Sequence, residues 1–180
     1  MNSPAQSEPD LGAVFDAHIA SEFETPDLDA TMATMTDHPV LTHVPVLTGG
    51  TGREAVRAFY GKYFLRHWPA DTRIQRLSRT VGQDRLIDEL VLSFTHDIEM
   101  PALLPGVKPT GKKVELAHVV VVGFEGGKVA FERIYWDQAS LLAQIGLLDA
   151  SQLPVTGAEQ ARRVLDPTLP SNELIRRAES

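Results

Sequence analysis

The sequence predicts an α+β fold, in which helices come first and a run of antiparallel strands with a closing helix follows. Three observations lead to this prediction. Apolar residues recur at helical spacing in the N-terminal part of the chain. Residues 114–124 are rich in valine and too β-branched to favour a helix. Gly126-Gly127 then forms a two-residue turn that tolerates positive φ, so residues 129–136 are expected to return as the partner strand of a hairpin.

The elements before this hairpin are predicted from apolar spacing and from their boundary residues. Residues 1–10 hold Ser, Pro, Gln and Glu and are expected to be disordered. The expected elements that follow are a helix over 10–23, a short helix after Thr25-Pro26-Asp27, a strand over 38–43, a glycine-rich loop over 48–52, a helix over 52–67 and strands over 73–81 and 85–97.

The end of the chain is predicted to continue the same body. Residues 100–109 form a loop with three prolines before the hairpin, and residues 138–148 form a final helix. The domain is expected to cover residues 11–148. The remaining segment, 149–180, contains prolines and scattered apolar residues, so it is expected to pack on the body or on another subunit.

The register of the hairpin decides which side chains share a face of the sheet. With a two-residue turn, His118 is predicted to lie opposite Tyr135, and Leu116 opposite Asp137. One face would then carry His118, Arg133, Tyr135 and Asp137, while Glu132 and Trp136 lie on the other. A slip of one residue would move these groups to opposite faces.

Length and composition bound the possible function. The chain has 180 residues, enough for one domain, and no cysteine, which excludes thiolate nucleophiles and Cys-ligated zinc. A net charge of -7 argues against binding to nucleic acid or to an anionic membrane surface. The start of the chain lacks the apolar segment of a signal peptide and no apolar run is long enough to span a bilayer, so a cytoplasmic protein is expected.

Several sequence patterns that mark catalytic sites do not occur. The six histidines do not show His-x-His or His-Glu-x-x-His spacing, so no metal site is expected. The Gly-x-Ser-x-Gly turn of serine hydrolases and the dinucleotide-binding fingerprint are missing as well.

A set of short motifs resembles a known family. They are Gly52-Arg53-Glu54-Ala55, Trp68-Pro69-Ala70-Asp71, Pro105-Gly106 followed by Pro109-Thr110-Gly111-Lys112-Lys113-Val114, then Gly127-Lys128 and Trp136-Asp137. In this order and spacing they resemble the SnoaL-like branch of the NTF2-like superfamily, which includes polyketide cyclases. The resemblance covers roughly residues 11–148.

The resemblance implies a cone-shaped α+β fold, in which a curved antiparallel sheet wraps around helices and leaves an apolar pocket. It also implies a homodimer formed through the sheet, and proton-transfer chemistry without a metal or an organic cofactor. In the cyclases an aspartate near the end of a late strand removes a proton. Asp137 is the best match to that aspartate in this sequence.

The catalytic candidates each have a structural alternative. Asp137 is a candidate general base, but it also precedes a helical pattern and is equally well explained as the N-cap of that helix. His118 and Tyr135 are candidates for polarising a substrate oxygen, and the alternative is a hydrogen-bonded pair in the core.

Further candidates for substrate binding are His43, Tyr60, His96, Glu89, Glu132 and Trp136. His43 is expected at the pocket rim, where a solvated histidine is the alternative. His96 stands beside Asp97 as an oriented base or as a surface turn pair. The Tyr60 hydroxyl points into the pocket or the ring packs in the core. Glu89 and Glu132 lie within apolar strands and require an arginine partner or a raised pKa.

Two functions follow from these observations. The first is a cofactor-free enzyme of the cyclase, isomerase or hydrolase type that acts on a small hydrophobic carbonyl or polycyclic substrate. The second is a binding protein that holds a small hydrophobic molecule without catalysis. Titratable groups that converge in the pocket favour the enzyme, and an entirely apolar lining favours the binding protein. A homodimer is expected in either case, because residues 114–122 are apolar on both faces of their strand.

Overall fold

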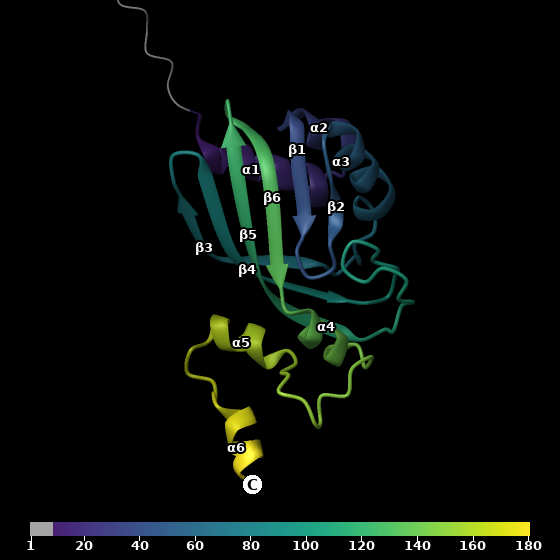
Figure 1. Cartoon of the computed structure of the whole chain (residues 1–180), viewed down its shortest axis with the longest axis vertical. Helices are drawn as coiled ribbons and strands as arrows, with labels where there is room; N and C mark the ends of the chain where they lie inside the picture. The colour runs from purple at the N-terminus through teal and green to yellow at the C-terminus, as the bar shows by residue number, and fades with distance from the viewer. Residues whose placement is uncertain (1–8) are drawn as a thin grey trace, which may run out of the picture.

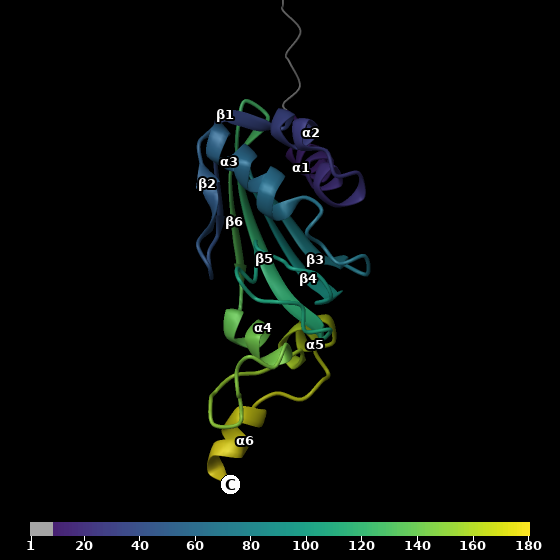
Figure 2. The same ribbon diagram turned by 90° about the vertical axis from the view of Figure 1, so that its right-hand side faces the viewer.

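The computed structural model describes residues 9–180. It contains a strongly curved six-stranded sheet in the order β2-β1-β6-β5-β4-β3, with α1, α2 and α3 on its concave side (Figures 1 and 2). The predicted α+β class is therefore confirmed. The prediction of a disordered N-terminus falls largely on residues 1–8, which lie outside the described part of the chain.

The elements in chain order are α1 (Leu11–Ile19), a π-helical turn η1 (Ala20–Glu24), α2 (Leu28–Ala33), β1 (Met35–His43), β2 (Thr48–Thr51), α3 (Arg53–Phe59), a π-helical turn η2 (Tyr60–Phe64), β3 (Arg73–Val81), β4 (Arg85–Thr95), β5 (Lys113–Glu125), β6 (Lys128–Trp136), α4 (Gln138–Gln144), α5 (Glu159–Leu165) and α6 (Glu173–Glu179). None of the helices in residues 9–180 has the length and apolar character needed to cross a membrane.

The predicted loop over 48–52 is the main error in the expected element order. Residues 48–51 form the short strand β2, which pairs with β1 in antiparallel register. A Cβ atom on Gly49 would lie 2.0 Å from the carbonyl oxygen of Leu41, so this close pairing requires glycine. β1 also pairs in parallel with β6, and the sheet is antiparallel elsewhere.

The predicted register of the β5–β6 hairpin is wrong beyond its turn. Glu125 faces Lys128 as expected, but a β-bulge follows, and Ala130 is the extra residue on β6. His118 therefore pairs with Trp136 rather than with Tyr135. Further along, Val122 pairs with Glu132. The bulge thus moves Glu132 and Trp136 onto the face of His118, and Tyr135 onto the opposite face.

Gly123, next to the bulge, leaves room for the ring of Phe131, which packs where a side chain at position 123 would start. A Cβ atom at Gly123 would lie 2.1 Å from Cε1 of Phe131. We expect Gly123→Ala to lower the free energy of unfolding by about 1–3 kcal/mol, since the ring or the strand must move. The measurement is equilibrium denaturation in urea. The matched control is Gly82→Ala, whose Cβ would have its nearest neighbour at 3.6 Å. Equal effects of the two substitutions would contradict this account of the bulge.

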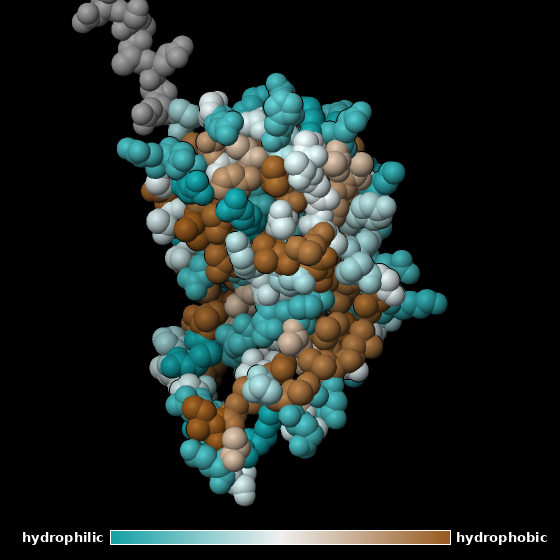
Figure 3. Space-filling model, viewed as in Figure 1, coloured by the Kyte–Doolittle hydropathy of each residue, from teal (hydrophilic) through white to brown (hydrophobic). Residues whose placement is uncertain are grey.

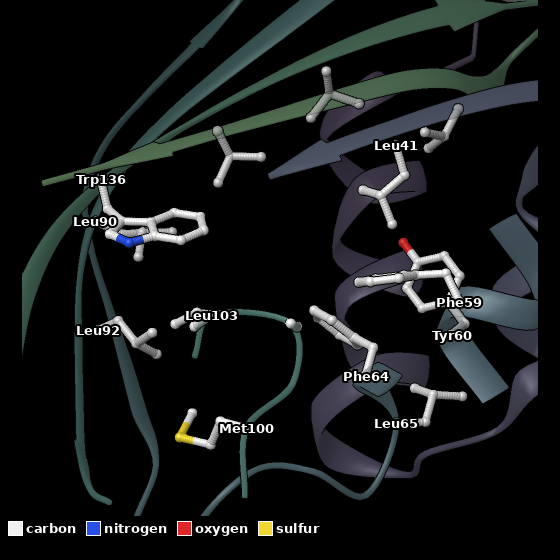
Figure 4. Packing of buried hydrophobic residues seen from close by; sticks show 14 of the residues in the cluster. Leu41, Phe59, Tyr60, Phe64, Leu65, Leu90, Leu92, Met100, Leu103 and Trp136 are labelled. Atoms are coloured by element: carbon white, nitrogen blue, oxygen red, sulfur yellow. The ribbon is translucent and has the colours of Figure 1, made fainter. Parts of the chain in front are cut away.

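The core fills the concave side of the sheet. Figure 4 shows Trp136, Leu90, Leu92 and Leu103 on one side and Leu41, Phe59, Tyr60 and Phe64 on the other. All of these side chains are buried. The candidate site lies within this layer, between α1 and the sheet.

The C-terminal segment runs along the open end of the sheet (Figures 1 and 2). α5 packs against β5, where Ala161 is fully buried and Arg162 binds the carboxylate of Glu115 at 2.6 Å. α6 buries none of its residues.

Candidate active site

A cavity of about 80 Å³ lies between α1 with its π-helical turn and the concave face of the sheet. Its apolar lining comes from Phe15, Ile19, Phe23, Leu41, Phe64, Trp68, Ile74, Leu90, Leu92, Leu103, Val120 and Ile134. Five titratable side chains also line it, namely Glu22, His43, Tyr60, His118 and Glu132. A fully buried histidine, His18, stands directly behind Glu22 and Glu132. The cavity therefore combines apolar walls with a concentrated group of ionisable side chains.

The local sequence explains how these groups are placed. His18 and Glu22 are four residues apart on one helical run, on the same side as the buried Leu11 and Phe15. Glu132 reaches the concave face because of the bulge in β6. Tyr60 is fully buried at the point where α3 passes into η2. Helix and sheet thus bring their polar groups to one place inside the core.

His18 is held as an imidazolium. Its Nε2 lies 3.0 Å from Oε1 of Glu22 and 3.0 Å from Oε1 of Glu132. Its Nδ1 lies 2.6 Å from Oγ1 of Thr34, which donates its own hydrogen to the carbonyl of Thr31 and so accepts from Nδ1. Burial alone would lower the pKa of His18, but the attraction of the two carboxylates outweighs burial and raises it to about 10.

The two carboxylates differ in their proton affinity. Burial raises the pKa of Glu22, and the nearby His18 charge offsets only part of that effect. Burial would also raise the pKa of Glu132, but the charge and hydrogen bond of His18 and the hydroxyl of Tyr60 at 3.1 Å lower it below its usual value. Burial and both carboxylates raise the pKa of Tyr60 well above 10, so its phenol stays neutral. The surroundings therefore favour the ionised form of Glu132 and the protonated form of Glu22.

Two neutral imidazoles line the same cavity. Burial lowers the pKa of His43 and of His118 to about 4 in each case. Nδ1 of His118 lies 3.2 Å from the carbonyl of Leu116, which only accepts, so Nδ1 carries the hydrogen and Nε2 carries a lone pair. Nδ1 of His43 has no hydrogen-bond partner among the described residues. Both rings lie against Trp136, with ring centroids 5.8 and 5.4 Å away.

The cavity adjoins a wider surface groove of about 750 Å³. Six residues line both spaces, and these are Ile19, Glu22, Phe23, Trp68, Ile74 and Leu90. Phe23, Phe64 and Trp68 contact one another, with ring centroids 5.0 to 5.8 Å apart. Glu22 therefore lies where the groove passes into the cavity, beside an aromatic wall.

Four of the residues selected from the sequence line the cavity: His43, Tyr60, His118 and Glu132. Trp136 does not line it, but supports His118 from behind and donates from Nε1 to Oε1 of Gln138 at 2.6 Å.

Four other selected residues lie elsewhere. Asp137 is exposed and caps α4, where Oδ1 accepts from the backbone amides of Ala139 and Ser140 at 2.9 and 3.2 Å. Its N-cap interpretation is confirmed, and its expected place on the face of His118 is wrong. Tyr135 lies on the outer face of the sheet and is 41% exposed, because the bulge in β6 turns it away from the face of His118.

Glu89 and His96 also lie outside the cavity. Glu89 is exposed on the outer face of β4, where its Oε2 accepts from the hydroxyl of Ser78 at 3.2 Å. His96 is fully buried, so it does not form the surface turn pair with Asp97 that was one alternative. Its Nδ1 lies 3.2 Å from Oγ1 of Thr110.

Sequence reasoning missed His18 and Glu22. A signal for both was present, because positions 11, 15, 18 and 22 form one stripe of the predicted helix and two of them are polar. A buried ionisable pair at this spacing is costly unless it finds a partner. The partner, Glu132, lies 110 residues further along than Glu22, and only the fold brings it there.

His18, Glu22 and Glu132 also have ligand atoms within 4.8 Å of one another, a spacing that a divalent cation could bridge. A cation would need the lone pair on Nε2 of His18. That nitrogen is held protonated, with a pKa of about 10, by the same two carboxylates. A metal ion would therefore have to displace the proton that Nε2 shares with the two carboxylates.

Comparisons with known proteins agree with this fold. The model of a family described as the SnoaL-like domain matches residues 15–132. No curated protein matches the sequence. Among solved structures, a provisionally assigned SnoaL-like polyketide cyclase from Jannaschia has a TM-score of 0.59 and 18% identity, and the match covers 83% of this chain and 99% of that one.

Two further structures are similar. TsrD from Streptomyces laurentii has a TM-score of 0.61 and 16% identity, covering 77% of this chain and 96% of that chain. AclR from Streptomyces galilaeus, a provisionally assigned hydroxylase, has a TM-score of 0.58 and 22% identity, covering 77% of this chain and 86% of that chain. At these identities the likeness to the solved structures supports the fold alone.

Proposed function

The chain belongs to the SnoaL-like domain family, and from that premise we propose that it is a cofactor-free enzyme that uses general acid–base chemistry on a small hydrophobic carbonyl compound. The observation that carries the proposal is the pair of buried carboxylates at the cavity, whose proton affinities are shifted in opposite directions. Neighbouring titratable groups with separated pKa values are the arrangement that assigns acid and base roles in enzymes.

Glu22 is the proposed proton carrier. Burial raises its pKa above the usual value of a glutamate, which makes its carboxylate a stronger base, and it lies at the boundary of cavity and groove. The His18–Glu132 ion pair positions Glu22 through the 3.0 Å contact of His18 with its carboxylate. His18 and Glu132 are thus positioning residues in this proposal.

In the proposed step, the carboxylate of Glu22 takes a proton from the carbon next to a substrate carbonyl. The electron pair of the broken C–H bond forms a C=C bond, and the carbonyl π electrons move to oxygen, which gives an enolate. The neutral imidazole of His43 can donate a hydrogen bond to this oxygen, a contribution often worth roughly 2.7–4 kcal/mol per donor. For an isomerisation, Glu22 then returns the proton to another carbon of the substrate. For an internal ring closure, the enolate carbon instead forms a C–C bond to a second carbonyl carbon, the π electrons of that carbonyl move to its oxygen, and Glu22 gives its proton to this alkoxide.

The size of the site restricts the reacting group. A cavity of about 80 Å³ is smaller than the roughly 300–1,000 Å³ of most ligand pockets, whereas the adjoining groove of about 750 Å³ lies within that range. We therefore expect the reacting end of the substrate in the cavity and the remainder in the groove. The mostly apolar lining predicts a compact reacting end in which the carbonyl is the main polar group.

The experiment is proton exchange in D₂O, followed by NMR for a panel of cyclic ketones, aryl ketones and lactones. It detects deprotonation next to a carbonyl without knowledge of the product. We expect at least one compound to exchange its α-protons faster with the protein than with buffer alone. If every compound that binds exchanges at the buffer rate, the acid–base proposal is wrong.

A second candidate is a binding protein without catalysis. The observation that favours it is the engagement of both carboxylates by His18 within a mostly apolar lining. In this case thermal-shift binding of panel members would occur without α-proton exchange. The same experiment therefore separates the two functions.

We also propose a homodimer formed through the outer face of the sheet. On this face, hydrophobic patches lie between hydrophilic residues (Figure 3). Ile87, Val119 and Tyr135 on three adjacent strands are each about two-fifths exposed, and Val119 pairs directly with Tyr135.

Light scattering is expected to show a dimer at micromolar concentration. Val119→Arg should shift it toward the monomer, because a charge would be buried in the interface. Val81→Arg, on the edge strand β3, is the control and should leave the dimer unchanged.

A further inference from the structure

We propose that the cavity binds a small organic cation, namely the head group of a protonated or quaternary methyl-substituted amine. The proposal concerns the same cavity as the proposed function but does not depend on catalysis. Two features carry it: two buried carboxyl groups that share a single cationic partner, and aromatic rings around the space next to them.

The buried charges of the cluster balance only while Glu22 keeps its proton. Glu22 and Glu132 are two carboxylates, each about 5% exposed, and His18 supplies one positive charge between them. No lysine or arginine lines the cavity in the part of the chain that the structure describes. With both carboxylates ionised, the cluster carries a net charge of -1. An uncompensated buried charge is costly, so the cluster must either retain a proton or accept a cation from solution.

The walls next to Glu22 are aromatic. Phe15, Phe23, Tyr60, Phe64 and Trp68 all line the cavity, and Figure 4 shows the rings of Tyr60 and Phe64 side by side. Phe23 and Trp68 have ring centroids 5.0 Å apart, and Phe64 lies 5.2 Å from Trp68. A cation within about 6 Å of such ring centroids is attracted to their faces, and aromatic cages recognise quaternary ammonium groups in this way.

The dimensions select a small head group. A cavity of about 80 Å³ has room for a compact group, and the groove beyond Trp68 can receive an attached chain. The position of Glu22 at the junction places its carboxylate next to a head group that enters from the groove.

Binding should also release a proton. Burial raises the pKa of Glu22, and the groups that face it are His18 on α1, Tyr60 on η2 and Glu132 on β6. A cation bound beside Glu22 favours its ionised form. The proton leaves the site as the cation enters it, and uptake of a neutral ligand has no such effect.

Isothermal titration calorimetry of the full chain tests the proposal with choline and with its neutral carbon isostere, 3,3-dimethylbutan-1-ol. We expect choline to bind about tenfold more tightly than the isostere. Titration in two buffers with different ionisation enthalpies should show proton release for choline alone. Equal affinities of the two ligands, or no choline binding up to about 10 mM, would overturn the proposal.

Substitutions identify the groups responsible. Glu22→Gln keeps the shape of the side chain and should abolish both the preference for choline and the proton release. Trp68→Leu should weaken choline more than the isostere. Glu125→Gln is the matched control, because Glu125 is exposed at the β5–β6 turn and lines neither the cavity nor the groove, and it should bind choline as the wild type does. A Glu22→Gln protein that retains the preference for choline would contradict the assignment. Should that variant fail to fold, the comparison of the two ligands on Trp68→Leu decides.

These outcomes are independent of turnover. Choline binding without α-proton exchange would support the cation site and reject the acid–base function. Exchange of a ketone without any preference for choline would give the opposite result.

Discussion

Replacing His18 by leucine is expected to lower the free energy of unfolding by about 3–5 kcal/mol, the usual cost of removing one partner of a buried ion pair. Leucine fills much of the space but leaves Glu22 and Glu132 without their cation. The hydroxyl of Thr34 also loses the hydrogen bond that it accepts from Nδ1 of His18 at 2.6 Å. Urea denaturation at neutral pH measures the change.

A second substitution separates charge from packing. In His18→Leu combined with Glu132→Gln, the uncompensated anion is removed, so much of the lost stability should return. If the double variant is as unstable as the sum of the two single variants, the ion pair does not explain the effect.

The same ion pair predicts how stability depends on pH. The pKa of His18 is about 10 in the folded protein, whereas the ordinary value of 6.5 applies to the unfolded chain. Protonation of His18 therefore favours the folded state. This contribution is fully present below pH 6.5 and is lost as the pH rises through about 10. We expect wild-type stability to fall over that range, and the His18→Leu variant to lack this part of the decrease.

Replacing Glu22 by glutamine is expected to reduce the rate of α-proton exchange by about 10²–10⁴-fold, the usual contribution of a positioned general acid–base group. Glutamine is close in shape to the protonated acid, so the fold should persist, as the melting temperature will show. Asp137→Asn is the control, because asparagine remains a good N-cap for α4. It should leave both the exchange rate and the melting temperature unchanged.

Much of the fold was predictable because the relevant signals are local. Valine content, the Gly126-Gly127 turn and apolar spacing predicted β3, β4, the hairpin and the helical run of α3 and η2 to within a few residues. β2 was missed because two glycines suggested a loop, whereas the close approach of β1 is what requires Gly49. That approach is a tertiary contact, which no local pattern reports.

The candidate site was predictable only in part for a related reason. His43, Tyr60 and His118 were selected as candidates from apolar surroundings or a position near a strand end, and all three line the cavity. The face of β6 depended on one extra residue, Ala130, and the bulge exchanged the roles expected of Tyr135 and Glu132. The bulge lies where Phe131 packs over Gly123, a tertiary contact that the alternation of side chains does not reveal.

The most direct test of the proposed acid–base cluster compares α-proton exchange in D₂O for three proteins: wild type, Glu22→Gln and Asp137→Asn. The substrate is the panel ketone that the wild type exchanges fastest. Our account predicts rapid exchange by the wild type and by Asp137→Asn, and a loss of at least about 10²-fold in Glu22→Gln with an unchanged melting temperature. Wild-type exchange by a folded Glu22→Gln protein would contradict it, as would loss of exchange in Asp137→Asn.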